Sequence, residues 1–112
     1  MKKIEAIIRP EKLESVQRAL EKVGYSGLMI SEIEGHGKQK GIVQQWRGEK
    51  YKVEFLPKIK IEIIVKDNEV ERIIKTIVDS AKTGEIGDGK IFISPIENAV
   101  RIRTGEKGEQ AI

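Results

Sequence analysis

One stretch of this chain predicts its own secondary structure with little ambiguity. From Lys58 to Lys66, branched apolar residues recur at every second position, as Ile59, Ile61, Ile63 and Val65, and most residues between them are charged. Because successive side chains of a strand point to opposite faces, this alternation predicts a strand that buries one face. The rest of the chain has to supply the layer that covers that face.

Two amphipathic helices can supply it. After Pro10, apolar residues recur at helical spacing at Leu13, Val16, Leu20 and Val23, and Gly24 then provides a stop. A wider apolar stripe predicts a second helix over 70–81; it consists of Val70, Ile73, Ile74, Ile77, Val78 and Ala81. Asn68 with Glu71 fits a capping box for this helix, and Asp67 is an adjacent candidate cap.

The order of the elements selects the fold class. Strands are predicted over 2–8, 27–34, 58–66 and 90–93, and each helix connects two of them. Two βαβ halves in tandem give an α+β fold, a ferredoxin-like double βαβ sandwich whose antiparallel sheet carries both helices on one face. We expect a single domain over 1–112, in which a short strand over 99–103 and a mobile tail over about 104–112 come last.

The segment between the second and third predicted strands, about 36–56, has no periodic apolar pattern. Loops of this length are uncommon in compact domains and are usually functional or disordered. Its composition favours a function, because glycines and basic residues open it and are followed by Trp46, Arg47 and Tyr51, residue types that anchor interfaces.

Composition excludes several classes of function. The chain has no cysteine and a single histidine, His36, which excludes thiol chemistry, disulfides, His-rich metal sites and catalytic triads. Charged residues make up 35% of the chain with both signs interspersed, and a net charge of +3 is a weak signal for nucleic acid. No segment reaches membrane-spanning length and the N-terminus has no signal-peptide pattern, so we expect a cytoplasmic protein.

The face of the sheet that the helices leave open carries apolar residues as well as charges. Ile7, Ile64 and Phe92 point opposite to the main apolar rows of their strands. They predict either oligomerisation through this face or isolated surface hydrophobes, and the pattern favours neither. Lys58 and Glu62 share the polar side of one strand, where such residues are usually solvated; beside an interface they would be placed to bind an acidic ligand and a nucleoside.

Three basic segments indicate an anionic ligand. Backbone N–H groups at 87–89 beside Lys90 can cradle an anion, although a plain glycine turn explains the same residues. Arg101 and Arg103, two apart on the predicted strand, would share a face and grip one phosphate, or else are exposed bases of an edge strand. The third segment, 35–41, combines glycines with two lysines. Together the three indicate a polyphosphate or carboxylate ligand.

These segments resemble the PII family of signal-transduction proteins. Residues 83–93, Thr-Gly-Glu-Ile-Gly-Asp-Gly-Lys-Ile-Phe-Ile, resemble its C-terminal signature, and residues 46–51, Trp-Arg-Gly-Glu-Lys-Tyr, resemble its T-loop. Residues 35–41, Gly-His-Gly-Lys-Gln-Lys-Gly, resemble the motif at the base of that loop. The motifs occur in the family's order, the strand plan agrees over essentially the whole chain, and the GlnK-like branch is the nearest fit.

The resemblance implies a non-enzymatic homotrimer that senses ATP or ADP and, beside Mg²⁺ and ATP, 2-oxoglutarate. The implied ATP and ADP contacts are Met29, Gly37, Lys38, Glu62, Ile64, Gly87, Asp88, Gly89, Lys90, Arg101 and Arg103. The implied 2-oxoglutarate contacts are Gly37, Lys38, Gln39, Lys40, Gly41 and Lys58, and the implied magnesium ligand is Gln39. Lys38 stands where the family usually has arginine, so a bidentate phosphate contact is lost. Met29 stands where threonine is common.

The resemblance also implies partners for the T-loop, about 36–56. Arg47 falls where GlnK-like members plug the pore of an ammonium transporter, and Tyr51 falls at the family's uridylylated position, a candidate modification site. Glutamine synthetase and other nitrogen-metabolism proteins are further candidate partners. No nucleic acid is expected, and the membrane is reached only through the transporter, at its inner face.

Two other classes of function are weighed against this one. A nucleotide- or RNA-binding ferredoxin-like module would need exposed aromatic residues on its sheet to stack bases, and only Phe92 qualifies. An enzyme of the same fold, such as a phosphatase, would need a nucleophile or general base, and the sequence has no evident candidate for either role.

Overall fold

The computed structural model of the chain describes residues 1–35, 43–46, 49–52 and 56–112. Its main sheet has four strands, β1 (Lys2–Ile8), β2 (Met29–Gly35), β5 (Leu56–Val65) and β6 (Lys90–Pro95), in the order β2-β5-β1-β6. All neighbouring pairs are antiparallel.

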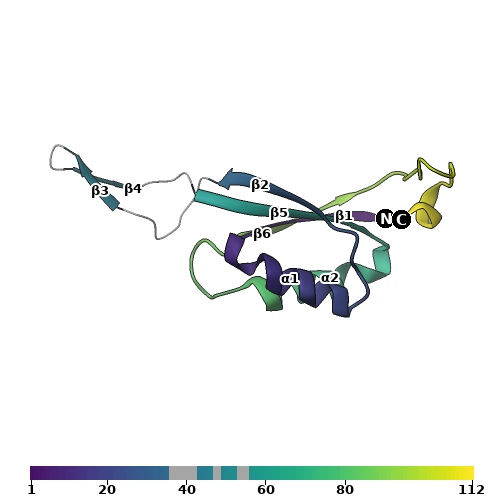
Figure 1. Ribbon diagram of the computed structural model, residues 1–112, viewed down its shortest axis with the longest axis horizontal. Helices are drawn as coiled ribbons and strands as arrows, with labels where there is room; N and C mark the ends of the chain where they lie inside the picture. The colour runs from purple at the N-terminus through teal and green to yellow at the C-terminus, as the bar shows by residue number, and fades with distance from the viewer. Residues whose placement is uncertain (36–42, 47–48, 53–55) are drawn as a thin grey trace.

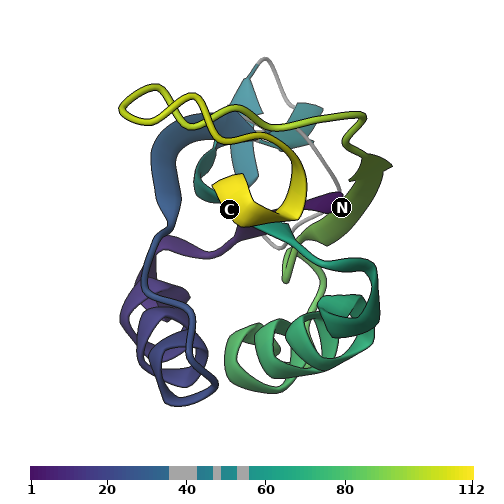
Figure 2. The ribbon, with the colours of Figure 1, turned by 90° about the vertical axis from the view of Figure 1, so that its right-hand side faces the viewer.

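Helices α1 (Leu13–Lys22) and α2 (Val70–Ala81) each connect two strands that have a third strand between them. The helices lie side by side on one face of the sheet and leave the other face open (Figure 1, Figure 2). This arrangement confirms the predicted α+β, ferredoxin-like fold.

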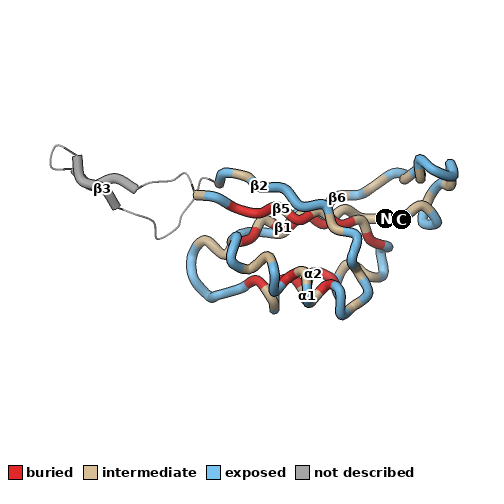
Figure 3. The backbone as a smooth tube through the Cα atoms, in the orientation of Figure 1, coloured by how far each residue is buried: buried red, intermediate tan, exposed pale blue. Residues whose placement is uncertain are grey.

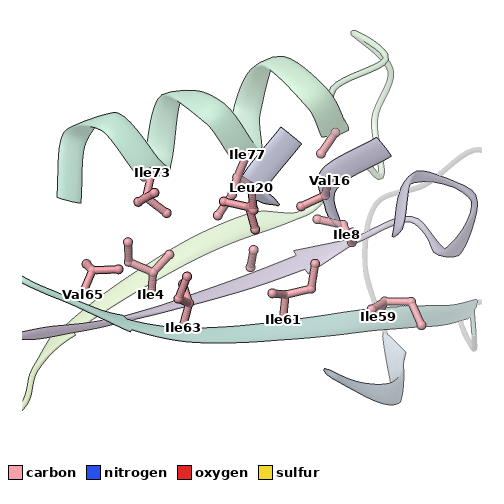
Figure 4. Packing of buried hydrophobic residues seen from close by; sticks show 12 residues of the cluster. Ile4, Ile8, Val16, Leu20, Ile59, Ile61, Ile63, Val65, Ile73 and Ile77 are labelled. Atoms are coloured by element: carbon pink, nitrogen blue, oxygen red, sulfur yellow. The ribbon is translucent and has the colours of Figure 1, made fainter. Parts of the chain in front are cut away.

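The core lies between the sheet and the helices (Figure 4). Ile4 pairs with Ile63 and Ala6 with Ile61, so alternate residues of β1 and β5 share the side that faces the helices. In Figure 3 the buried positions run along these two central strands and along the inner sides of both helices. Among the residues whose burial the structure describes, the buried hydrophobic ones are Ile4, Ala6, Ile8, Val16, Leu20, Ile59, Ile61, Ile63, Val65, Ile73, Ile77 and Ala81.

A 3-10 turn precedes each helix, η1 (Pro10–Lys12) before α1 and η2 (Asp67–Glu69) before α2, and neither helix has a side-chain cap. The predicted capping box of Asn68 and Glu71 is therefore wrong. The Asp67 carboxylate instead accepts a hydrogen bond from the Met1 ammonium group at 2.9 Å, and this bond lowers the pKa of Asp67. The predicted stop at Gly24 is confirmed, since Gly24 adopts a φ of 96° after α1.

The segment predicted as an aperiodic loop contains a two-stranded sheet, in which β3 (Val43–Trp46) pairs antiparallel with β4 (Glu49–Lys52). Gly35 of β2 pairs with Leu56 of β5, so the chain leaves the main sheet and returns to it at neighbouring positions (Figure 1). Sequence reasoning missed β3 and β4 because Val-Gln-Gln-Trp and Glu-Lys-Tyr-Lys hold too few apolar residues to show a period of two.

The predicted strand over 99–103 is wrong. Val100 makes an isolated antiparallel bridge with Lys107, and the Gly105 N–H donates to the Arg101 carbonyl at 2.7 Å to close a turn between them. The backbone reverses here because Gly105 adopts a φ of 74°, which glycine reaches without strain. A short 3-10 helix, η3 (Gly108–Ala111), follows. The mobility of residues 104–112 stays a prediction.

Candidate functional site

The turn between α2 and β6 is organised around the carboxylate of Asp88. Its Oδ2 accepts hydrogen bonds from the backbone N–H groups of Thr83 at 2.8 Å and Gly84 at 2.9 Å, and its Oδ1 accepts one from Thr83 Oγ1 at 2.5 Å. These bonds from Thr83, with those from Arg9 and Gly84, hold the pKa of Asp88 well below its usual range. The N–H groups of Thr83 and Gly84 therefore already have an anionic acceptor within the chain.

Two cations hold the turn from the other side. Arg9, directly after β1, donates from Nε to Asp88 Oδ1 and from Nη2 to the Ile86 carbonyl, both at 3.0 Å. Lys58 of β5 donates from Nζ to the Gly87 carbonyl at 2.7 Å. Sequence reasoning missed Arg9. The available signal was a basic residue directly after β1, at the end of the sheet where Lys58 of β5 also lies.

The site combines charges of both signs in a partly dry environment. Lys58 is only 8% exposed, and burial, followed by the nearby charge of Arg9, lowers the pKa of its ammonium group. The negative charges of Glu11 and Asp88 act in the opposite direction, and the pKa of Lys58 is nevertheless lowered. An added carboxylate or phosphate would stabilise the charged form of Lys58, so the arrangement suits an anionic ligand.

Gly89 brings the backbone of the turn unusually close to β1. It adopts a φ of +100°, and a Cβ atom built on it would lie 1.7 Å from the carbonyl oxygen of Ile7. No residue larger than glycine fits this position without a backbone shift. Lys90 follows directly, pairs opposite Ile7, and is exposed on the open face of the sheet. The close packing of the turn against β1 thus fixes the position of the Lys90 backbone on that face.

Several other predicted site residues lie outside the described residues. They are Gly37, Lys38, Gln39, Lys40, Gly41 and Arg47. The backbone of Tyr51 lies in β4. Because Ile33 pairs with Lys58, β2 ends beside the Lys58 end of the site, and the chain enters the 36–42 segment there.

The predicted nucleoside contacts share the open face. Met29 pairs opposite Glu62, and Glu62 pairs opposite Glu5. Ile64 comes two residues after Glu62 in β5 and therefore lies on the same face. Met29 is 52% exposed, and Glu62 is placed 3.5 Å from the Lys60 ammonium group. These side chains offer an apolar surface next to a carboxylate, which suits an adenine ring with its amino group.

The two predicted phosphate-gripping arginines lie in the turn after Val100. Arg101 Nη1 donates to Glu106 Oε1 at 2.7 Å, and Arg101 Nη2 donates to the Gln110 carbonyl at 3.0 Å. Arg103 is exposed. The prediction that both arginines project from one face of a strand is wrong, because the chain turns within 101–105.

Within one chain, the turn that carries Lys90 lies far from the turn that carries Arg101 and Arg103. Along β6, Lys90 pairs with Ile7 and Pro95 pairs with Lys2, so the strand carries the chain the length of the sheet. At about 3.3 Å per residue, these positions are about 17 Å apart. In Figure 1 the turn before β6 lies at the hairpin end of the sheet, whereas the C-terminal segment lies at the opposite end.

Within the described parts of the chain, no group of three or more His, Cys, Asp or Glu side chains is arranged to hold a metal ion. No helix among the same residues is long and apolar enough to cross a membrane.

Comparison with known proteins gives a consistent match over the whole chain. The family model described as Nitrogen regulatory protein P-II matches residues 1–106. Proteins of that name from Microchaete diplosiphon and Nostoc punctiforme are 56% and 55% identical to this chain over 112 residues, which cover all of each chain. Nitrogen regulatory protein P-II 2 of Methanothermobacter thermautotrophicus is 55% identical over 112 residues, all of this chain and 97% of that one. The chain therefore belongs to the nitrogen regulatory protein P-II family, whose members are regulatory signalling proteins and not enzymes.

Proposed function

We propose that this protein is a homotrimeric sensor that binds ATP or ADP, with Mg²⁺ and 2-oxoglutarate, in clefts between its subunits. The separation of its two basic groups carries the proposal. The turn with Lys90 and the loop with Arg101 lie at opposite ends of β6 in one subunit. A second copy of the chain can bring its own Arg101 and Arg103 to the turn of the first, so that one phosphate chain meets both groups.

In this arrangement each part of the site has a separate task. The backbone at 87–89 and Lys90 hold phosphates, and the close approach of Gly89 to Ile7 fixes the position of this turn against β1. Met29, Glu62 and Ile64 on the open face contact the adenine side. Arg101 and Arg103 of the neighbouring subunit complete the phosphate site.

Mg²⁺ and 2-oxoglutarate fit the chemistry of the hairpin end. Mg²⁺ prefers oxygen ligands and keeps part of its coordination for phosphate, so the Gln39 amide oxygen with the ATP phosphates is a suitable set. Lys58 and Arg9 offer positive charge for a carboxylate, and the remaining 2-oxoglutarate contacts are assigned to residues 37–41. Because Lys38 replaces an arginine, it offers a single ammonium charge and not the bidentate hydrogen bonds of a guanidinium group.

The output is the T-loop, which leaves the sheet beside Lys58. Ligands that bind its base favour some loop conformations over others, and a partner binds the favoured one. Arg47 is assigned to the pore of an ammonium transporter and Tyr51 to covalent modification, with glutamine synthetase as a further candidate partner. The protein then works in the cytoplasm and reaches the membrane through the transporter.

Mixed trimers test the shared site. A Lys90→Ala subunit and an Arg101→Ala, Arg103→Ala subunit are each expected to bind ATP weakly as homotrimers. After the two are denatured, mixed equally and refolded together, about a quarter of the clefts would combine one intact turn with one intact pair of arginines. Calorimetry should then recover that fraction of high-affinity ATP sites. Recovery of none, with mixed trimers verified by mass, would contradict the shared cleft.

Calorimetry with and without Mg²⁺-ATP tests the sensing role. We expect 2-oxoglutarate heat only when Mg²⁺-ATP is present, and Lys58→Met should abolish it while ATP still binds. Because the pKa of Lys58 is lowered, its charge is lost at a lower pH than that of an ordinary lysine. The affinity for 2-oxoglutarate should therefore fall as alkaline pH removes this charge. An affinity independent of Lys58 would reassign the ligand.

A further inference from the structure

Arg101 is held by acceptors of its own chain. Its Nη1 donates to Glu106 Oε1 at 2.7 Å and its Nη2 donates to the Gln110 carbonyl at 3.0 Å, so both arms of the guanidinium fork are engaged. A guanidinium fork matches a carboxylate as well as it matches a phosphate. The residue assigned to phosphate binding therefore already has an anionic partner.

The surrounding turn fixes Glu106 in this position. The Thr104 hydroxyl donates to Glu106 Oε1 at 2.9 Å, and the Arg101 N–H donates to the Glu106 carbonyl at 2.9 Å. Asn98 Oδ1 accepts from the Gly108 N–H at 3.0 Å and so ties the two arms of the turn together. The pairing of Glu106 with Arg101 is thus part of a turn that has its own backbone hydrogen bonds.

The pairing is also weak enough to be exchanged. The side chains of Arg101 and Glu106 are 37% and 39% exposed, so water screens their attraction. A phosphate group carries more negative charge and more acceptor oxygens than a carboxylate. A polyphosphate can therefore replace Glu106 at Arg101, whereas a ligand with a single carboxylate gains nothing by doing so.

We propose that Glu106 is an internal competitor for the phosphate site: its carboxylate occupies Arg101 in the free protein, and a nucleotide phosphate has to displace it. This inference rests on the proposed function, since it takes Arg101 as a phosphate ligand. Displacement also breaks the bridge from Thr104 through Glu106 to Arg101. The exchange thereby favours nucleoside polyphosphates and links nucleotide occupancy to the 98–111 turn.

Two substitutions test the competition. Glu106→Gln keeps the shape of the side chain and an acceptor for Thr104 but removes the charge that holds Arg101. Glu109→Gln makes the same change in net charge at an exposed position of the same segment and is the matched control. Thr104→Val loosens Glu106 without changing any charge. ATP affinity is measured for all three by calorimetry, and the thermal midpoint verifies that each is folded.

We expect Glu106→Gln to tighten ATP binding roughly two- to fivefold relative to Glu109→Gln, the range that an exposed ion pair allows. Thr104→Val should tighten it less, in the same direction. Weaker binding by Glu106→Gln would mean that Glu106 positions Arg101 for the ligand, and equal binding by both glutamine variants would remove its role; either result overturns the competition while ATP binding stands. If the unaltered protein binds no ATP, the proposed function fails and this inference fails with it.

Discussion

Asp88 controls whether the turn before β6 has a fixed shape. Both of its carboxylate oxygens accept hydrogen bonds, from the side chain and backbone of Thr83, from Gly84 and from Arg9. Arg9 in turn holds the Ile86 carbonyl. Because Asp88 binds both the backbone of the turn and Arg9, the shape of the turn and the position of this cation depend on one side chain.

Asp88→Asn should lower the thermal midpoint of the protein at neutral pH, because an amide has one acceptor oxygen where four donors converge. The pKa of Asp88 is lowered on folding, so its contribution to stability is present above its ordinary pKa and is lost as the pH falls through the folded value. Acidification below about pH 4 should therefore reduce the difference between the two proteins. Differential scanning calorimetry across this range provides the measurement.

Asp79→Asn is the control for that experiment. The pKa of Asp79 is also lowered, by its hydrogen bond to Lys75, but the pair is exposed on α2 and is expected to contribute little. A midpoint of Asp88→Asn no lower than that of Asp79→Asn would show that the turn does not need its carboxylate.

At the scale of elements, β1 and β6 approach so closely at the turn that only glycine fits. Gly84 and Gly89 both have positive φ, 90° and 100°, but they differ in their surroundings. Nothing lies within 4 Å of a Cβ built on Gly84, whereas a Cβ on Gly89 would meet the Ile7 carbonyl oxygen. The two positions therefore separate backbone strain from steric contact.

Gly84→Ala should cost about 1–2 kcal/mol of unfolding free energy, the strain of an L-residue at positive φ. Gly89→Ala adds the contact with Ile7 and should cost about 3 kcal/mol or more. Urea unfolding measures both. Equal costs would mean that β1 yields easily at Ile7, and the turn would then not be a rigid part of the site.

The hairpin element can be removed with little effect on the main sheet, because Gly35 and Leu56 are already paired neighbours. Replacing residues 36–55 by Asn-Gly joins β2 to β5 through a two-residue turn. We expect the far-ultraviolet spectrum of the four-stranded sheet to persist and the unfolding free energy to change by about 1 kcal/mol or less, since loop closure depends weakly on length. Binding of 2-oxoglutarate should be lost.

An unfolded product would contradict this expectation. It would mean that residues 36–55 pack on the main sheet and stabilise it.

The sequence predicts the main sheet and both helices because their apolar residues follow regular periods, as from Ile59 to Val65. It does not reveal β3 and β4, whose residues are mostly polar, nor the role of Arg9, which depends on a contact with Asp88, 79 residues away. The turn at Arg101 was misread as a strand because Val100 and Ile102 alternate with arginines, while Gly105 reverses the backbone. Local pattern predicts elements; contacts between distant residues have to be seen.

At the scale of the whole molecule, the open face of the sheet is the surface that the proposed trimer would bury. Phe92 is 55% exposed there, and Met29 lies in the same row across the sheet, with Glu62 and Glu5 between them. The row thus has an exposed apolar side chain at each edge of the sheet and carboxylates between them, and a second copy of the chain can cover such a surface.

Phe92→Glu should therefore dissociate the trimer without unfolding the subunit, because a carboxylate would be desolvated at the interface. Val78→Glu makes the same kind of change on α2, away from the open face, where Val78 is 41% exposed, and should leave the trimer intact. Light scattering after gel filtration gives the mass of each variant. A trimeric Phe92→Glu protein, or a monomeric unaltered protein, would contradict assembly through this face.

The turn with Lys90 and the turn with Arg101 lie at opposite ends of β6, and this placement determines how mutations in them would act in a cell that also makes the normal chain. In the proposed trimer each subunit gives its turn to one cleft and its arginines to the next. A single altered subunit that lacks both would impair two of the clefts at once, so a cell that makes altered and normal chains together would lose more sites than the altered share. Mutations of this kind should be genetically dominant.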